Sequence, residues 1–151
     1  MIKLYLPALE DLWFRQKLLS DEETMSFNHA YGGVIDFPKE KWYDRWVINH
    51  ENKRFYCYVI DENKNFVGEV AYHLDEERNV YLENVIIFSA YRRKGYGGQA
   101  LDLLCKEAKN NGIEVLYDDV ANDNPAITMF IQRGFVVEFE TKSYMMLKKK
   151  L

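Results

Sequence analysis

The stretch YRRKGYGGQAL, residues 91–101, places three basic residues directly before three glycines, and an apolar pattern of helical period follows. Glycine leaves backbone N–H groups uncovered, and the first N–H groups of a helix have no partner within the helix. The helix macrodipole also favours negative charge at this end. The stretch therefore predicts an anion-binding loop that opens a helix. A glycine-rich turn with a solvated basic face is the alternative.

Two strand patterns flank this loop and its helix. VYLENVIIF (residues 80–88) precedes the loop, and IEVLYDDV (residues 113–120) follows the helix, whose pattern ends at Gly112. A strand–helix–strand connection joins parallel strands of one sheet in nearly all proteins. We therefore expect these two strands to lie parallel.

The remaining patterns predict mostly antiparallel strands. RFYCYVI (54–60) and FVGEVAYHL (66–74) are joined to each other and to residues 80–88 by short polar turns, as in an antiparallel meander. The other expected elements are a strand in residues 1–6, helices in 7–20, 39–50 and 124–133, and a closing hairpin in 134–149. This order is that of an α+β protein.

Length and composition limit the classes of function. The 151 residues are most simply one domain, and a net charge of −4 argues against a general nucleic-acid binder. The N-terminal segment has early charges and no long apolar run, which predicts no signal peptide or membrane span and a cytoplasmic location. Cys57 and Cys105 lie in apolar patterns without metal-type spacing, so we expect reduced core thiols and no metal site.

Three kinds of phosphate loop compete for residues 91–101. A Walker-type loop needs Lys and Ser/Thr after its last glycine, whereas Gln99 and Ala100 stand there. The dinucleotide fingerprint is matched by Gly95-x-Gly97-x-x-Ala100, and Asp118 and Asp119 end the next strand, where a ribose-binding acid is expected. Against it, SAYRRK separates the motif from its strand, and only 50 residues follow position 101.

The third kind matches more of the chain. Arg92-x-x-Gly95-x-Gly97 resembles the pyrophosphate loop of the GNAT superfamily of acyl-CoA-dependent N-acyltransferases. NDNPAITMFIQRGF (122–135) resembles the second signature of that family, whose spacing is occupied by Ala126, Phe130, Gly134 and Phe135. The resemblance covers residues 54–149 well and the first 50 residues in arrangement alone.

The resemblance implies one GNAT domain over residues 1–151, with a mixed, mostly antiparallel sheet, helices on both faces and acetyl-CoA as cosubstrate. The amides of residues 93–98 would hold the pyrophosphate, the strand before the loop would pair with pantetheine, and Asn122 or Asn124 would bond the pantetheine arm. The residues implied in coenzyme A binding are Val85, Ile86, Ile87, Arg92, Arg93, Lys94, Gly95, Tyr96, Gly97, Gly98, Asn122 and Asn124. For Asn124, capping of the following helix is the alternative role.

Pairing with pantetheine needs free N–H and C=O groups on the strand at residues 80–88. We therefore expect this strand to splay from the strand at residues 113–120 and to leave a cleft between them.

Direct acyl transfer requires a base for the amine and a donor to the developing oxyanion. Glu83 lies on the same strand face as Tyr81 and Ile87, so it is a candidate base, directly or through water. A surface-facing or salt-bridged Glu83 is the alternative. His73 on the neighbouring strand is the second candidate, with a structural histidine as its alternative. Phe130 stands where many family members carry a proton-donating Tyr, and Tyr117 or water could replace it.

The acceptor site is less well defined by the sequence. Residues of the loop and helix before position 50 combine aromatic rings with acids, which would suit a cation such as a primary amine or polyamine, although core packing explains them equally. These residues are Phe27, His29, Tyr31, Asp36, Phe37, Trp42 and Trp46. The expected function is N-acetyl transfer to a small-molecule or peptide amine, without nucleic-acid or membrane partners. A non-catalytic acyl-CoA-binding module is the alternative, and a homodimer is compatible with the family.

Overall fold

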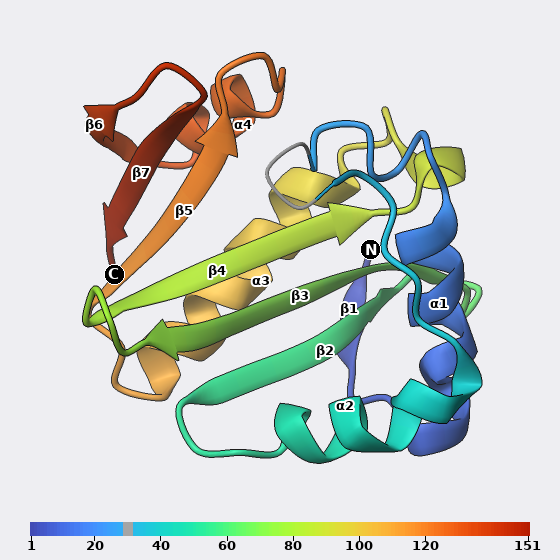
Figure 1. Cartoon of the computed structure of the whole chain (residues 1–151). Coiled ribbons are helices and arrows are strands. Elements are labelled where there is room, and N and C mark those ends of the chain that lie inside the picture. The colour runs from blue at the N-terminus through green and yellow to red at the C-terminus, as the bar shows by residue number, and fades with distance from the viewer. Residues whose placement is uncertain (29–31) are drawn as a thin grey trace.

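The computed structural model describes residues 1–28 and 32–151. Within them, seven strands form one sheet in the order β1-β2-β3-β4-β5-β7-β6 (Figure 1). The strands are β1 Lys3–Tyr5, β2 Arg54–Ile60, β3 Phe66–Asp75, β4 Val80–Ile87, β5 Val115–Ala121, β6 Val136–Glu140 and β7 Tyr144–Lys150. The α-helices are α1 Trp13–Ser20, α2 Trp42–Asn49, α3 Tyr96–Asn110 and α4 Ile127–Gln132.

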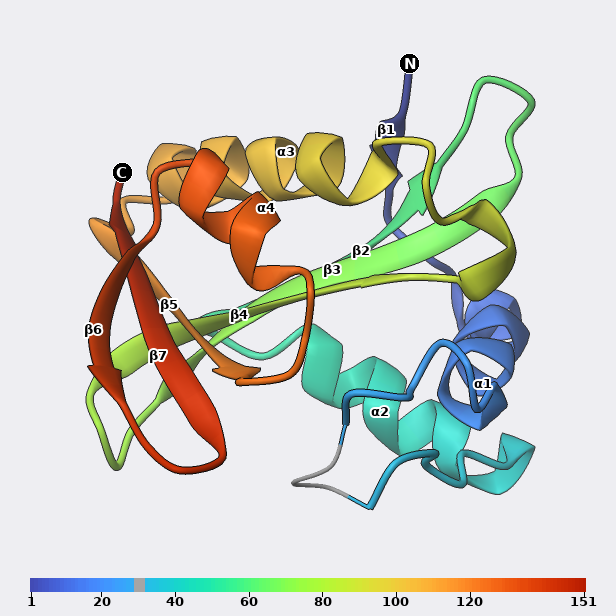
Figure 2. The ribbon, with the colours of Figure 1, turned by 90° about the horizontal axis from the view of Figure 1, so that it is seen from above.

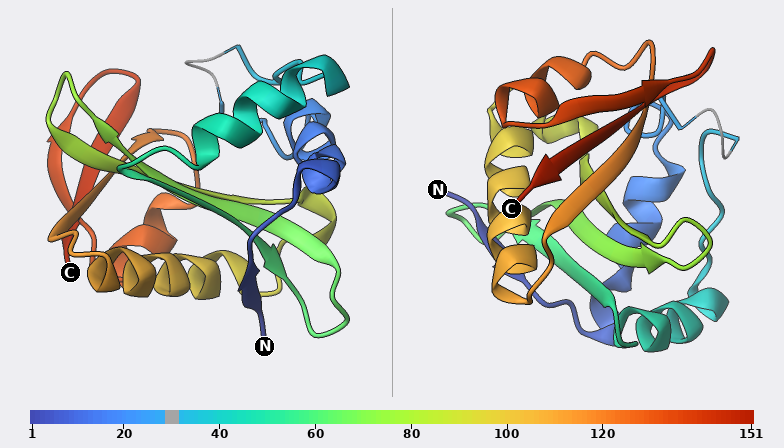
Figure 3. Two further views of the ribbon diagram at one scale, coloured as in Figure 1. Left: turned by 90° about the horizontal axis from the view of Figure 1, so that it is seen from below. Right: turned by 90° about the vertical axis from the view of Figure 1, so that its left-hand side faces the viewer.

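The sheet is mixed and mostly antiparallel, as expected. β2, β3 and β4 form the antiparallel meander, whereas β4 and β5, which are joined through α3, are parallel. Helices α1 and α2 cover one face of the sheet, and α3 and α4 cover the other (Figures 2 and 3). The predicted α+β architecture with helices on both faces is confirmed.

Three of the predicted helices, α1, α2 and α4, begin later as α-helices than their patterns indicated, and 3-10 turns precede the first two. The segments Leu9–Leu12 and Lys39–Lys41 are 3-10 turns that lead into α1 and α2. Both turns follow a residue with extended backbone, Ala8 and Pro38, respectively. Tight turns of this kind are frequent at helix N-termini, and sequence periodicity does not separate them from the α-helix.

The core beneath α3 follows the stripe predicted from the sequence. Leu101, Leu104 and Ala108 are fully buried and belong to one apolar cluster with Val70 and Leu116 of the sheet. Cys57 and Cys105 are buried free thiols in the same cluster. No helix within residues 1–28 and 32–151 is long and apolar enough to cross a membrane.

The opposite face of the sheet buries a charged pair among aromatic rings. Glu69 of β3 is fully buried, and Arg15 of α1 donates to its carboxylate from Nη1 at 2.5 Å. Tyr58 donates its hydroxyl proton to Asp11 O at 2.8 Å and accepts from the Arg15 N–H at 3.2 Å. A buried carboxylate needs such a partner, since desolvation of an isolated charge costs several kcal/mol. The pair therefore fixes α1 against β3.

The parallel strands β4 and β5 pair only at their beginnings. Tyr81 is in register with Leu116 and Leu82 with Tyr117, and no further partners join the two strands among the described residues. Figure 1 shows both strands starting together and diverging. The expected splay is confirmed.

Gly68 lets β3 approach the far half of β4. A Cβ atom at this position would overlap the Ile86 carbonyl oxygen and lie 3.1 Å from Ile87 Cα. Because these are backbone atoms of the neighbouring strand, the two strands would have to move apart to admit a side chain.

We predict that Gly68→Ala destabilises the protein by about 1–3 kcal/mol, the usual range for an overpacked site. In thermal unfolding this lowers Tm by roughly 2–4 °C per kcal/mol for a chain of this size. The control is Gly97→Ala, because a Cβ there has its nearest neighbours at 3.8 and 3.9 Å. Equal Tm values for both variants would contradict the prediction.

Candidate active site

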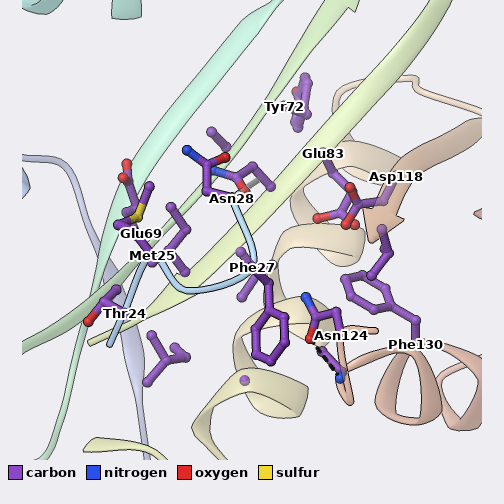
Figure 4. Close-up of a pocket in the computed structure, with 18 of the residues that line it drawn as sticks. Thr24, Met25, Phe27, Asn28, Glu69, Tyr72, Glu83, Asp118, Asn124 and Phe130 are labelled. Atoms are coloured by element: carbon purple, nitrogen blue, oxygen red, sulfur yellow. Dashed lines mark hydrogen bonds between the residues drawn. The ribbon is translucent and has the colours of Figure 1, made fainter. Parts of the chain in front are cut away.

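A cavity of about 970 Å³ passes through the divergence of β4 and β5. Its wall includes the glycine loop at the start of α3, the far half of β4, and the end of β5. It continues over β2 and β3 to α2, where Arg45 and Asn49 line it. Figure 4 shows side chains from both sheet faces around this space.

The glycine loop presents unpaired N–H groups at one end of the cavity. Gly95 is the N-cap of α3 with φ 80°, and Arg93 also has a left-handed φ of 65°. No side chain of the described residues caps the helix there. Left-handed φ is strained for a residue with a side chain such as Arg93, and such strain is typical of ligand loops. The loop is thus shaped to bind an anion through backbone amides.

The three basic residues of the loop have different environments. The Arg92 guanidinium donates to three backbone carbonyls, Ile87 O at 3.2 Å, Glu23 O at 3.1 Å and Thr24 O at 2.8 Å. It therefore fastens the segment after α1 to the end of β4, a role that sequence reasoning missed. Arg93 and Lys94 are exposed at the rim. These two remain the cations best placed for a phosphate.

A second set of bonds fixes the same junction. The Ser89 N–H donates to Thr24 Oγ1 at 2.9 Å, and Ser89 Oγ donates to Asp21 Oδ2 at 2.6 Å. The Ser89 and Thr24 bonds lower the pKa of Asp21. The wall of the cavity between α1 and the glycine loop is therefore held by side chains from both segments.

The edge of β4 facing the cavity carries free backbone groups. The Phe88 N–H donates to Val67 O, and alternate residues of a strand point the same way. Ile86, which is in register with Glu69, therefore directs its backbone toward β3, whereas Val85 and Ile87 direct theirs into the cleft. Ile86 therefore lines the cavity without a free backbone edge. Val85 and the Ile87 N–H are the backbone groups able to pair with an extended ligand, because Ile87 O already accepts from Arg92.

A carboxyl pair occupies the vertex where β4 and β5 separate. Glu83 and Asp118 each stand one residue beyond the last paired residues, Leu82 and Tyr117. Their carboxyl groups lie together in Figure 4. Glu83 is 4% exposed, and neither of its carboxyl oxygens accepts a hydrogen bond from any described group. The surface-facing and salt-bridged alternatives for Glu83 are therefore wrong.

Burial and proximity change how this pair ionises. Burial raises the pKa of Glu83 well above its usual value, and the neighbouring Asp118 raises it further. Burial raises the pKa of Asp118 to about 7, and the adjacent Glu83 side chain partly opposes this rise. Two adjacent buried carboxyl groups cannot both ionise at neutral pH, so they share one proton. From the sequence, Asp118 was expected only as a ribose-binding acid, although the crossover pattern could have placed it beside Glu83.

His73 does not meet Glu83. It is in register with Leu82, one residue from Glu83, and successive side chains of a strand point to opposite faces of the sheet. His73 thus lines the cavity on the α2 face, where burial and then Arg54 lower its pKa. The two catalytic candidates from the sequence lie on different faces and do not act as a pair.

The two candidate asparagines have different positions. Asn122 donates from Nδ2 to Thr141 O at 2.9 Å and lies outside the cavity wall, so its expected ligand role is corrected. Asn124 lines the cavity, and its Oδ1 accepts the Ala126 N–H at 2.9 Å. This bond closes a turn just before α4, whose N-cap is Ala126, so the capping role expected as the alternative is wrong, while Asn124 still lines the cleft.

Phe130 fills the position expected of a tyrosine. It is buried in the cavity wall and packs edge to face on Phe135 at 5.3 Å. Tyr117, one expected substitute for the missing hydroxyl, is absent from the residues lining the cavity. Two ionisable groups, the carboxyl groups of Glu83 and Asp118, stand at the vertex where β4 and β5 separate.

One of the aromatic residues considered for a bound cation, Phe37, already contacts Arg15. The Arg15 guanidinium carbon lies 5.4 Å from the ring centres of both Phe37 and Tyr56. His29 and Tyr31 fall outside the described residues. Phe37 is therefore in contact with Arg15, the counter-ion of Glu69, and is not open to a bound amine. For the other described residues of this set, the amine site stays a prediction.

Several solved structures share this fold. PaiA N-acetyltransferase from Thermoplasma acidophilum, in complex with coenzyme A, superposes with a TM-score of 0.79 at 18% identity, covering 100% of this chain and 99% of that one. Spermidine N-acetyltransferase from Vibrio cholerae, in complex with CoA and spermine, gives 0.82 at 19%, covering 99% and 95%. A putative acetyltransferase from Acinetobacter baylyi gives 0.83 at 14%, covering 100% and 93%. No curated protein matches the chain by sequence.

A family model, Acetyltransferase (GNAT) family, matches residues 10–135. The match includes the glycine loop, the vertex of β4 and β5, and Phe130. With the sheet order and the splayed parallel strands, it establishes the relationship that the two sequence motifs indicated. The chain belongs to the GNAT family of acetyltransferases.

Proposed function

We propose that the protein transfers an acetyl group from acetyl-CoA to a primary amine, directly within a ternary complex. One observation carries the proposal: a free strand edge leads from the uncapped N-terminus of α3 to a buried carboxyl pair. Anion site, extended binding edge and base thus lie in series along one cavity. The coenzyme A bound to PaiA and to the spermidine enzyme supports this use of the fold.

Coenzyme A would bind along β4. Its pyrophosphate meets the amides of residues 93–98 at the helix N-terminus, with Arg93 and Lys94 at the rim. Its pantetheine amides pair with Val85 and Ile87 as an added strand. This arrangement brings the thioester toward the vertex at Glu83, because the strand runs from there to the glycine loop.

The transfer needs no covalent acyl-enzyme. The amine lone pair attacks the thioester carbonyl carbon, the C–S bond breaks, and coenzyme A leaves as its thiolate. Cys57 is no candidate nucleophile, since burial and then Glu107 raise its pKa to about 11. The Val85 N–H, which is directed into the cleft two residues from Glu83, is the donor for the developing oxyanion.

The carboxyl pair would carry the proton in both directions. At neutral pH the pair holds one proton, so its ionised member accepts the proton lost by the amine, directly or through water. The pair then returns a proton to the departing thiolate. In this scheme Glu83 and Asp118 supply the acid that the phenyl ring of Phe130 lacks.

A non-catalytic acyl-CoA-binding protein is the second candidate function. The observation that favours it is Phe130, which has no hydroxyl group to protonate the thiolate. Such a protein would bind coenzyme A but release no thiol with any amine.

We predict that acetyl-CoA and coenzyme A stabilise the protein and that NAD and ATP do not. A ligand at 100 times its dissociation constant adds about 2.7 kcal/mol, an easily measured rise in Tm. Gly97→Ala should keep the Tm of the free protein but lose most of this rise, because the added methyl group projects between Ile87 and Met129 in the cleft. Stabilisation by NAD in place of acetyl-CoA would exclude the proposed function.

We predict that Glu83→Gln and Asp118→Asn each lower kcat by about 10²–10⁴-fold, the usual contribution of a general base. The rise in Tm with acetyl-CoA should remain, because neither side chain binds the phosphates. Thiol release under saturating acetyl-CoA measures the loss. Full activity of both variants would place the base elsewhere, and a wild type that binds coenzyme A without turnover would favour the second function.

The raised pKa values also predict a pH-dependent stability. A group whose pKa is higher in the folded state stabilises the protein at low pH and loses this contribution as pH rises through the folded value. For Asp118, whose pKa rises from 3.8 to about 7 on folding, the contribution is lost between these two pH values. The Tm of Asp118→Asn relative to wild type should therefore rise between about pH 4 and about pH 7. Glu76→Gln, in an exposed turn, is the control and should show no trend.

A further inference from the structure

The α1 and α2 side of the cavity contains buried nitrogen atoms without partners. Among the described residues, five side chains carry such a nitrogen atom, and all of them lie on α1 or α2. Three of these side chains, those of Arg15, Arg45 and Asn49, line the cavity. Their unpartnered atoms are Nε in the two arginines and Nδ2 in Asn49. Leaving a buried donor unpaired costs about 1–3 kcal/mol, so such a cluster is typical of a site that a ligand completes.

This end of the cavity also has surplus positive charge. Glu69 is the buried carboxylate there, and Arg15 already neutralises it. Within residues 1–28 and 32–151, neither Arg45 nor Arg54 has an ion pair. Burial, and then Arg15, lower the pKa of Arg45, as expected for a cation lacking a counter-ion.

The neighbouring acids do not remove this surplus. Asp75 and Asp119 are near His73, and Arg78 stands 3.7 and 3.8 Å from their carboxylates, respectively, and neutralises part of their charge. Glu83 and Asp118 belong to the vertex. Two guanidinium groups therefore face the cavity without a carboxylate of their own.

The end of the cavity that carries Arg45 and Arg54 lies in one row of strand partners with the vertex of β4 and β5. Arg54 is in register with His73, His73 with Leu82, and Leu82 with Tyr117, the last pair before the strands diverge. Neighbouring strands lie about 4.8 Å apart, so β2 is roughly 10 Å from β4 along this row. Arginine side chains from β2 and α2 span much of that distance.

The unpaired groups at the two ends are complementary in kind. The vertex offers unsatisfied acceptors, the carboxyl oxygens of Glu83, whereas the α2 end offers unsatisfied donors on Arg45 and Asn49. A ligand that completes both ends carries an amine at one position and an anionic acceptor at another. A polyamine would place a further cation beside Arg45 and Arg54, where repulsion is strong because the site is partly buried.

We infer that the acceptor is an amino acid, whose amine meets the thioester at the vertex and whose carboxylate is bound by Arg45, Asn49 and Arg54. This inference rests on the proposed acetyl transfer and specifies its substrate class. Arginine suits the task because its planar guanidinium binds a carboxylate through two parallel hydrogen bonds.

The test compares amino acids with the amines that lack only the carboxylate. Tyrosine is paired with tyramine, lysine with cadaverine, and ornithine with putrescine, and spermidine is added. Thiol release from acetyl-CoA is measured for each. We expect at least one amino acid to exceed its decarboxylated partner in kcat/KM by about 10-fold or more, the value of one charge-assisted hydrogen bond.

A variant identifies the group that binds the carboxylate. Arg45→Gln should lower kcat/KM for the preferred amino acid by about 10–100-fold, chiefly through KM. Turnover of the matched amine and the rise in Tm with acetyl-CoA should not change. Lys106→Gln, which removes an equal charge from the exposed side of α3 outside the cavity, is the control and should leave all these values unchanged.

Three results would overturn the inference: acetylation of the amines in preference to the amino acids, an equal loss with both substrates in Arg45→Gln, or no amino acid acetylated at all. Failure of the underlying function looks different, since the protein would then show no rise in Tm with acetyl-CoA. Acetylation of spermidine alone would keep the function and remove the inferred substrate class.

Discussion

The short pairing between β4 and β5 is the constraint on which the site depends. Two residue pairs join the strands, and β5 then continues along β7 through its full length. The hydrogen bonds that a parallel sheet would make between β4 and β5 are left open for a ligand. α3 connects β4 and β5 and packs against the sheet. The two strands therefore separate while their side chains still share one apolar core with α3.

Two buried acidic residues, Glu69 and Glu83, have different surroundings in this fold. Glu69 has Arg15 as a close counter-ion, and the pair holds α1 on the sheet. Glu83 has no ion-pair partner among the described residues, and the carboxyl group of Asp118 is its neighbour. Such a pair lowers stability wherever both groups would ionise, and proteins retain this kind of arrangement at functional sites. The contrast favours Glu83 and Asp118 as the chemical centre.

The cavity also shows why a shared fold does not determine a substrate. The spermidine enzyme superposes well at 19% identity. In this chain, however, Arg15 fills the aromatic surroundings of Phe37 and Tyr56, and Arg45 and Arg54 line the same space. Substrate choice depends on such side chains, which vary while the backbone remains similar.

The sequence by itself determined the elements that depend on local pattern. The glycines at 95 and 97, the helix after them and the crossover to residues 113–120 gave the α+β order, the anion loop and the family, because turn chemistry and periodicity act over short distances. Only the tertiary structure decided that Arg92 clamps backbone carbonyls, that Asp118 meets Glu83, that His73 faces the other side, and that Arg45 and Arg54 converge. These contacts join segments far apart in the chain, and strand register and helix packing, which no local pattern specifies, bring them together.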